Sequence, residues 1–252
     1  MTLSEFFSAH PAAAVAFSGG VDSALLLSEA RRCARRAAAY FVHTPFQPAF
    51  ELADARATAR LLEVELTVLE VDVLSLPEVA ANPADRCYHC KRALFTRLTA
   101  AAAADGFPLV LDGSNASDDA SDRPGMRALA ELGVRSPLRE CGLTKSQVRA
   151  MARQAGLPVW DKPSYACLAT RVPAGTPLTA AGLARVERGE SALMALGLSD
   201  FRLRLRGNEA LLQVRPEQTE LARALLARPP ETLVRDFTAV ALDPVPRESR
   251  ES

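Results

Sequence analysis

The stretch AAVAFSGGVDSALLL, residues 13–27, limits the fold of this chain more than any other segment. A short apolar run ends in Ser-Gly-Gly, and a helical pattern of apolar residues begins at once with Val21. A buried strand that turns directly into a helix is typical of a βαβ unit, in which the helix crosses back to a parallel neighbouring strand. The stretch therefore predicts an α/β fold with a parallel sheet.

Strand and helix patterns alternate through the first two thirds of the chain. The expected strands cover 38–42, 64–71 and 108–114, and the expected helices cover 48–62, 85–104 and 144–154. Thr144 and Gln147 have the spacing of a capping box, which marks the start of the last of these helices. This order predicts a doubly wound, mostly parallel sheet with helices on both faces.

The pattern changes near residues 172–177, where the segment VPAGTP is rich in proline and glycine. The next elements are a helix, two strands at 201–207 and 209–214, another helix and a last strand at 237–242. FRLRLRG alternates apolar and basic residues, which is typical of a half-exposed sheet. We therefore expect an α/β domain over residues 1–172 and a small α+β domain over residues 173–252.

Composition and charge exclude several classes of protein. Thirty basic and thirty acidic side chains cancel, whereas nucleic-acid-binding proteins usually carry a basic surplus. No apolar stretch reaches membrane-spanning length, and the first residues lack the pattern of a signal peptide. Five cysteines are an odd number in a chain of 252 residues, which favours core, metal or catalytic roles over disulfides. We expect a cytoplasmic protein that binds neither nucleic acid nor membrane.

The loop SGGVDS, residues 18–23, carries the chemistry of an anion-binding turn. Two adjacent glycines allow backbone N–H groups to approach a ligand closely, and the start of a helix adds partial positive charge. The two serines add hydroxyl donors. The loop lacks the GK[ST] of a Walker A sequence and is not the GxGxxG of dinucleotide-binding folds. A phosphate site is predicted here, and an ordinary helix-capping turn is the alternative.

This loop resembles the SGGxDS PP-loop of the N-type ATP pyrophosphatases, a resemblance that implies an adenine nucleotide alpha hydrolase-like fold. In that superfamily the loop grips the pyrophosphate of ATP, and attack on the α-phosphorus gives an adenylated substrate. The residues implied to bind ATP are Ser18, Gly19, Gly20, Asp22 and Ser23. The resemblance also implies that Asp22 helps to hold Mg²⁺ or positions the phosphates.

Cys87 and Cys90 stand three residues apart in the segment RCYHCK. On a helix they share one face, and they lie near its start beside Arg86 and Lys91, which favours the thiolate form. Cluster ligation, half of a zinc site with His89, a redox dithiol and inert thiols are the alternatives. A helix would direct His89 away from the face that the two cysteines share, which weakens the zinc alternative.

Five further segments stand in the order typical of one family: NPADRCYHCK (82–91), DGSNASDD (112–119), DRPG (122–125), GVRSPLRECGLTK (133–145) and GLPVWDKPSYACLATR (156–171). Together with the PP-loop they resemble LarE, the ATP-dependent sulfur transferases of nickel-pincer nucleotide synthesis, over nearly the whole chain. The resemblance implies that ATP adenylates a carboxylate of a pyridinium dicarboxylate mononucleotide and releases pyrophosphate. A sulfur nucleophile then displaces AMP and leaves a thiocarboxylate.

The sulfur source divides this family. In one type the cysteine of the ACLxxR segment gives up its own sulfur, and Cys167 holds that position here. The additional presence of Cys87 and Cys90 resembles the variant that binds a [4Fe-4S] cluster through three cysteines, which is the type expected here. Clusters are commonly held by four thiolates, so three leave one iron available for an extra sulfide.

The resemblance and the positions of charged residues complete the expected site. Expected catalytic residues are Cys167, Asp22, Lys91 and Arg171. Asp119 is the expected Mg²⁺ ligand, and the expected substrate or phosphate contacts are Arg123, Glu190, Arg202 and Arg204. Lys145 and Lys162 are further candidates for phosphate contacts. Solvated loops or an exposed sheet face are the alternative explanation for these charges.

Three rival functions share part of this pattern. A tRNA thiolase of the same superfamily would need a basic path for RNA, which the zero net charge argues against. An amide-forming ligase like NAD synthetase has no use for three cysteines. A regulatory nucleotide-binding module with structural zinc is the third. The implied partners are a small nucleotide substrate, a sulfide donor, other nickel-pincer biosynthesis proteins and further copies of the chain in a homo-oligomer.

Overall fold

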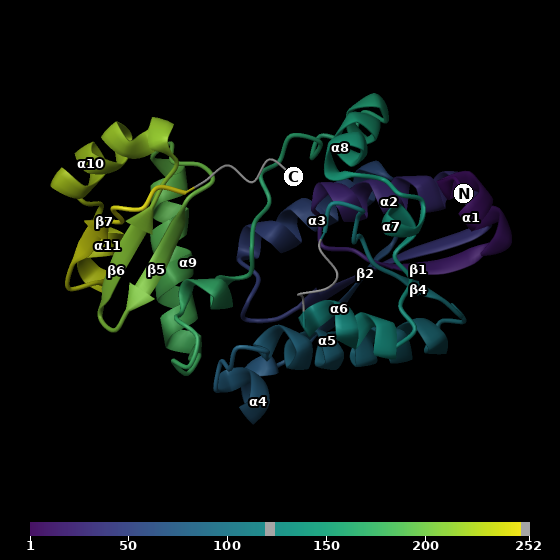
Figure 1. Cartoon of the computed structure of the whole chain (residues 1–252), viewed down its shortest axis with the longest axis horizontal. Coiled ribbons are helices and arrows are strands. Elements are labelled where there is room, and N and C mark those ends of the chain that lie inside the picture. Colours follow the sequence, from purple (N-terminus) through teal and green to yellow (C-terminus); the bar gives the residue numbers. More distant parts are fainter. Residues whose placement is uncertain (119–123, 248–252) are drawn as a thin grey trace. The chain divides into compact units, whose positions relative to one another are not determined.

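The computed structural model describes residues 1–118 and 124–247, which form two compact units (Figure 1). Within these residues, unit 1 comprises Met1–Val73 and the chain between Asp85 and Lys162, and unit 2 comprises Leu74–Ala84 and residues 163–247. Unit 1 contains a parallel sheet and unit 2 a small mixed sheet, so the predicted α/β class with a second, smaller domain is confirmed. Among the described residues, no helix is both long enough and apolar enough to cross a membrane.

The sheet of unit 1 consists of β1 (Ala12–Ala16), β2 (Arg36–His43), β3 (Leu66–Glu70) and β4 (Val110–Leu111). The strands are ordered β3-β2-β1-β4, and every neighbouring pair is parallel. The chain runs outward from β1 to β3 and then returns to place β4 on the other side of β1. In such sheets ligands bind at the carboxyl ends of the two strands where the order reverses. The segments that follow β1 and β4 therefore mark the expected ligand edge.

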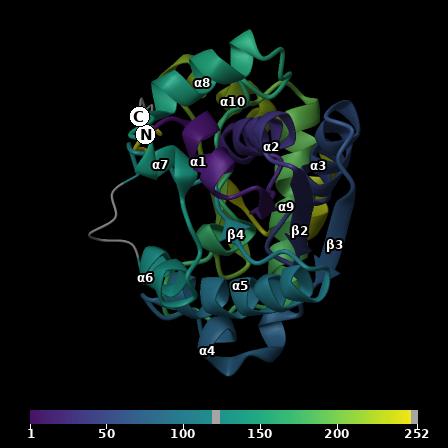
Figure 2. The same cartoon turned by 90° about the vertical axis from the view of Figure 1, so that its right-hand side faces the viewer.

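Helices cover both faces of this sheet. They are α1 (Leu3–Ala9), α2 (Val21–Cys33), α3 (Ala49–Leu61), α5 (Arg86–Ala104), α6 (Pro124–Glu131), α7 (Pro137–Glu140) and α8 (Lys145–Gln154). Ala13 and Val15 of β1 pack in one hydrophobic cluster with α1, α2, α3 and α8, whereas Ala14 packs in another with α5 and α6. Figure 2 shows α2 and α8 on one side of the strands and α5 and α6 on the other. Alternate residues of a strand face opposite sides, which explains this division.

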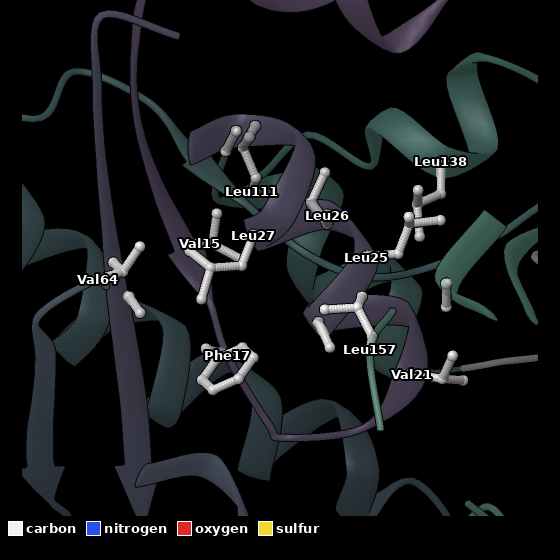
Figure 3. Close-up of a cluster of buried hydrophobic side chains, with 14 of the residues drawn as sticks. Val15, Phe17, Val21, Leu25, Leu26, Leu27, Val64, Leu111, Leu138 and Leu157 are labelled. Carbon is white, nitrogen blue, oxygen red and sulfur yellow. The ribbon is translucent and has the colours of Figure 1, made fainter. Parts of the chain in front are cut away.

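The centre of unit 1 is the packing of α2 on β1 (Figure 3). Leu25, Leu26 and Leu27 are consecutive, and all three are fully buried. A helix with apolar residues all round is buried on several sides. Here α2 lies against β1 and β2 and is also contacted by α1, α7 and α8. The small alanine side chains of β1 allow α2 to pack closely on the strand.

The start of α8 is fixed by the predicted capping box. The hydroxyl oxygen of Thr144 accepts a hydrogen bond from the backbone N–H of Gln147, and the Gln147 side chain accepts one from the backbone N–H of Thr144. The two bonds satisfy N–H groups that a helix start leaves without intrahelical partners. This prediction is confirmed, and it sets the direction in which Lys145, the first residue of α8, leaves the helix.

Unit 2 contains β5 (Arg202–Arg206), β6 (Glu209–Gln213) and β7 (Val240–Leu242) in that order, with β5 and β6 antiparallel and β6 and β7 parallel. Its helices are α4 (Pro77–Ala80), α9 (Ala180–Ala195), α10 (Thr219–Ala227) and α11 (Glu231–Asp236). Short 3-10 turns lie at η1 (Val73–Ser75), η2 (Leu168–Arg171) and η3 (Pro216–Gln218). Leu203 and Leu205 of β5 are buried, and the three arginines that alternate with them are more exposed, as the alternation predicts.

The division between the units differs from the expected boundary at residues 172–173. It falls between Lys162 and Pro163, because η2 packs on α9 and β5 within unit 2. The earlier segment Leu74–Ala84 also belongs to unit 2. The side-chain amide of Asn82 donates to the carbonyl oxygens of Pro173 and Thr176 at 2.9 and 3.1 Å. These bonds tie two stretches of chain that are far apart in sequence.

The packing of α9 on β5 depends on a buried glycine. A Cβ at Gly189 would lie 2.5 Å from Cδ2 of Leu203 and 3.2 Å from Cδ2 of Leu233, both of which are buried. We expect Gly189→Ala to lower the free energy of unfolding by about 1–3 kcal/mol, because overpacking outweighs the helix propensity of alanine. Urea unfolding measures the change. Ser191→Ala, at an exposed position of the same helix, is the control and should be neutral or slightly stabilising; a stabilised Gly189→Ala would contradict the packing argument.

Candidate functional site

The loop between β1 and α2 is shaped by two constraints on Gly19. Its φ angle is 73°, a left-handed conformation that favours glycine. A Cβ at this position would also lie 3.1 Å from the backbone N and Cα atoms of Ala55 in α3. Any side chain at residue 19 would therefore be strained and would push α3 away from the loop. Gly20 then forms the N-cap of α2.

Hydrogen bonds between the two serines close this loop. The backbone N–H of Ser18 donates to Oγ of Ser23 at 3.2 Å, and the two hydroxyl oxygens are 3.1 Å apart. The Ser23 hydroxyl also donates to the carbonyl oxygen of Gly20 at 3.1 Å. Ser23 is buried, whereas Ser18 is exposed. Ser23 therefore holds the loop in shape, and Ser18 is the serine that can reach a ligand.

The segment after β4 lies against the same helix start. A Cβ at Gly113 would be 3.0 Å from the backbone N of Ser23 and 3.2 Å from Cβ of Asp22. The amide of Asn115 donates to Oδ1 of Asp22 at 3.0 Å. The carboxyl ends of β1 and β4 are thus joined side by side, as the strand order requires. The turn at the start of α2 therefore lies at the switch point of the sheet, where ligands of such folds bind.

A lysine completes the surroundings of Asp22. Nζ of Lys145 donates a short hydrogen bond to Oδ2 of Asp22, and the side chains are only 12% and 22% exposed. Both oxygens of this carboxylate therefore have a partner, one from α8 and one from the loop after β4. The expected role of Asp22 in holding Mg²⁺ stays a prediction. They place a full positive charge beside the first turn of α2.

The loop after β4 is itself firmly held. Buried Asp112 accepts a hydrogen bond from the hydroxyl of Ser114 at 2.5 Å and another from that of Ser136. The guanidinium of Arg139 donates to the carbonyl oxygens of Asn115 and Asp118. Arg139 was not expected at the site, and its position in the segment SPLRE was the available signal. Asp119 and Arg123, both expected as ligand contacts, lie outside the described residues.

The cysteine pair begins α5, as predicted. Cys87 is exposed and Cys90 is half-buried. Nη2 of the buried Arg86 lies 3.5 Å from Sγ of Cys87, which places a positive charge beside this sulfur. His89 instead approaches Asp85, with Nε2 and Oδ2 3.3 Å apart. Thiolates at a helix start are suitable donors for an iron–sulfur cluster.

No metal centre is assembled by the described parts of the chain. Within residues 1–118 and 124–247, no three His, Cys, Asp or Glu side chains form a group that could hold a metal ion. All five cysteines lie in these ranges, and none forms a disulfide bond. Lys91 follows the pair, and its Cδ would be 2.8 Å from a Cβ at Gly125, so its stem lies across the start of α6. Iron–sulfur ligation stays a prediction.

In unit 2 the segment that contains Cys167 is anchored by a buried ion pair. Cys167 is the N-cap of η2, and Arg171 is its last residue. Nε and Nη2 of Arg171 donate to the two oxygens of Glu190 in α9 at 2.8 and 3.0 Å, and both side chains are almost fully buried. The Tyr165 hydroxyl and the backbone N–H of Leu203 also donate to Glu190.

Every oxygen of the Glu190 carboxylate is therefore satisfied from within unit 2. Burial alone lowers the pKa of Arg171, but the hydrogen bonds and the charge of Glu190 raise that pKa above the usual arginine value. Arg171 was expected to be catalytic, and Glu190 was expected to contact substrate or phosphate. Their geometry is that of a pair that joins η2, α9 and β5 and so fixes the orientation of the cysteine segment.

The two arginines of β5 share a face of the strand, as predicted. Nη1 of Arg202 lies 3.4 Å from Oγ1 of Thr170 in η2, and Nη2 of Arg204 donates to Oε1 of Gln213 at 3.1 Å. Nε of Arg204 is buried and has no hydrogen-bond partner among the described residues. Buried polar atoms are usually satisfied, so this unpaired guanidinium N–H is an exception in the packing of β5. Arg202, Arg204 and the Cys167 segment thus lie in one unit.

Comparison with known proteins agrees with this arrangement. No family model matches the sequence. An uncharacterized protein of Synechocystis sp. is 38% identical over 219 residues, which cover 86% of this chain and 82% of that protein. The pyridinium-3,5-bisthiocarboxylic acid mononucleotide synthase of Lactiplantibacillus plantarum is 34% identical over 202 residues, which cover 79% of this chain and 73% of the synthase. The chain therefore belongs to the family of this synthase, LarE, and the resemblance inferred from the motifs is confirmed.

A solved structure supports the fold of the chain. The NMN synthetase of Francisella tularensis matches with a TM-score of 0.53 and 20% sequence identity, covering 64% of this chain and 72% of the synthetase. At this level of identity the likeness concerns the fold alone. It agrees with the adenine nucleotide alpha hydrolase-like architecture expected from the PP-loop.

The ion pair of unit 2 can be tested through stability. Glu190→Gln keeps the shape of the side chain but leaves Arg171 as a buried charge without compensation. We expect the free energy of unfolding to fall by roughly 3–5 kcal/mol, with faster hydrogen exchange in α9 and β5. The apolar double replacement Arg171→Met with Glu190→Leu should recover most of that loss. Equal stability of Glu190→Gln and the unmodified protein, measured by urea unfolding, would refute the anchoring role.

Proposed function

We propose that this chain is an ATP-dependent sulfur transferase that acts on pyridinium-3,5-biscarboxylic acid mononucleotide. ATP would activate one ring carboxylate, and sulfur would replace an oxygen of that carboxylate to give a thiocarboxylate. Membership of the LarE family supports this reaction. The observation that carries the proposal is the turn of unit 1, where the loops after β1 and β4 and Lys145 surround the start of α2.

The first step is adenylation. The substrate carboxylate attacks the α-phosphorus of ATP, the bond to the β-phosphate breaks, and pyrophosphate leaves with the electron pair. The backbone N–H groups of Gly19 and Gly20 and the first turn of α2 are suited to hold the phosphates, because negative charge is stabilised at a helix start. Ser18 supplies an exposed hydroxyl. Asp22 orients this turn through its contacts with Asn115 and Lys145.

The second step transfers sulfur. A carboxylate oxygen is a poor leaving group, whereas AMP is a good one, so the acyl-adenylate is open to attack by a sulfur nucleophile. Sulfur bonds to the acyl carbon, and AMP leaves with the electrons of the broken C–O bond. Arg202 and Arg204 are proposed contacts for anionic groups of the substrate, with Arg171 and Glu190 as positioning residues. Lys91 remains a proposed catalytic residue, Asp119 a proposed Mg²⁺ ligand and Arg123 a proposed phosphate contact.

The proposed sulfur source is a [4Fe-4S] cluster held by Cys87, Cys90 and Cys167. Support comes from the donor chemistry, because all three are cysteines outside any disulfide and cysteine sulfur is the usual ligand of such clusters. When bound, the cluster would supply a labile sulfide at the iron that no protein thiolate holds. Sacrifice of the Cys167 sulfur is the alternative. A small sulfide donor and assembly into a homo-oligomer also belong to the proposal.

The adenylation step is tested by removing the charge of Asp22. Asp22→Asn keeps the size of the side chain but loses the ion pair with Lys145, so we expect substrate-dependent pyrophosphate release to fall roughly 100-fold. A coupled pyrophosphate assay measures the rate. Glu29→Gln is the matched control, since Glu29 lies on the same helix and pairs with the exposed Arg32, away from the loop. Undiminished release by Asp22→Asn would reject the assignment of this loop.

The sulfur source is tested by anaerobic reconstitution with counts of iron and sulfide per chain. We expect iron in the unmodified protein and in the control Cys33→Ala, and its loss in Cys87→Ala, Cys90→Ala and Cys167→Ala. Cys33 suits this purpose because it lies in α2, away from the cysteine pair in sequence. An unmodified protein that never holds iron would remove the cluster hypothesis. Loss of hydrogen sulfide from Cys167 during turnover, seen by mass spectrometry, would establish the sacrificial route instead.

A further inference from the structure

The chain uses lysine sparingly. Of its thirty basic side chains only three are lysines, namely Lys91, Lys145 and Lys162. Arginine therefore supplies nearly all of the positively charged side chains in this protein. A position that carries lysine is a candidate for chemistry that an ammonium group performs and a guanidinium does not. Lys145 is the lysine whose charge lies beside the proposed ATP loop.

Lys145 is held at both ends. Its backbone N–H donates to Oγ of Ser117 in the loop after β4 at 3.0 Å, and its Nζ donates to Asp22 in α2. The capping box of Thr144 and Gln147 fixes the first turn of α8 from which the side chain leaves. The side chain is only 12% exposed. Lys145 thus connects α8, the loop after β4 and the first turn of α2.

The contact with Asp22 uses part of the hydrogen-bonding capacity of this lysine. An ammonium group has three N–H donors, and one contact with Oδ2 of Asp22 occupies one of them. Oδ1 of Asp22 is taken by Asn115, which keeps the carboxylate turned toward the lysine. Asp22 is the second residue of α2, so the ammonium lies next to the helix start where phosphate is expected.

The choice of lysine over arginine fits this position. A guanidinium is planar and tends to pair with a carboxylate through two parallel hydrogen bonds, which would commit it to Asp22. An ammonium is compact and can divide its donors between the carboxylate and an oxygen of a phosphate. Lys162 is placed differently, because its Nζ pairs with Asp54 of α3 at 2.6 Å, and Asp54 is 44% exposed.

We propose that Lys145 is a phosphate-contacting residue, held by Asp22 beside the first turn of α2 so that it binds an anionic oxygen of a nucleoside triphosphate. The inference rests on the proposed use of ATP and adds a residue to that site. Besides orienting the turn, Asp22 then also positions the ammonium group of Lys145. The expected consequence is specific: the lysine contributes to affinity for the phosphates and leaves recognition of the nucleoside unchanged.

Calorimetric titration with ATP and with adenosine tests this division. In Lys145→Met we expect affinity for ATP to fall at least about tenfold, which corresponds to one charge-assisted hydrogen bond. Affinity for adenosine should stay within about twofold, because adenosine carries no phosphate. Arg31→Ala is the control, since Arg31 lies on α2 and forms only a distant surface pair with Glu63 at 3.8 Å. It should bind both ligands as the unmodified protein does.

Other outcomes overturn the proposal. Equal loss of affinity for ATP and adenosine would show that Lys145 only supports the loop, and unchanged affinity for ATP would show that it does not reach the phosphates. Failure of the unmodified protein to bind ATP would overturn the proposed function together with this inference, and so is distinguishable from either. If Lys145→Met does not fold, Lys145→Arg keeps the pair with Asp22 and should still weaken ATP binding selectively; full ATP affinity in that variant would refute the lysine requirement.

Discussion

The site in unit 1 depends on the close approach of three backbone segments around the start of α2. Gly19 allows α3 to contact the loop after β1, and Gly113 allows the loop after β4 to contact Ser23. A Cβ added at Gly19 or at Gly113 would lie 3.1 or 3.0 Å from the neighbouring backbone atoms, so a side chain at either position would force the segments apart. Because the segments meet so closely, side chains from separate parts of the chain reach the same carboxylate, that of Asp22. The chemistry of the turn therefore follows from backbone packing before any charge is considered.

Unit 2 uses a different device to place its functional segment. A buried ion pair gains little net stability over apolar residues of the same volume, because both charges lose their hydration. Arg171 and Glu190 nevertheless satisfy one another and engage Tyr165 and the backbone of β5. What this pair provides is geometry, since the directional bonds set how the turn that follows Cys167 lies on α9 and β5. A hydrophobic contact would hold the same elements together with less control over orientation.

Local patterns were predictable from the sequence, and pairings between distant segments were not. The turn after β1, the capping box of Thr144 and the alternation along β5 each depend on a few neighbouring residues. The Lys145–Asp22 pair joins positions 123 residues apart, and neither local sequence pattern indicates that the two residues are in contact. The burial of Glu190 could not be predicted for the same reason, because it depends on contacts with other segments. The expected domain boundary followed proline and glycine content, whereas the contacts of η2 with α9 and β5 join distant segments that no local pattern indicates.

The excursion of Leu74–Ala84 into unit 2 has a consequence for how the protein is made. During synthesis this segment leaves the ribosome long before residues 173–178, which supply its hydrogen-bond partners. Contacts between such distant positions form late and slow the folding of a chain. In the nascent protein, the segment between β3 and α5 therefore lacks its hydrogen-bond partners while the rest of unit 1 folds. Neither unit can be obtained by cutting the chain once, because each unit consists of two stretches that are separated in the sequence.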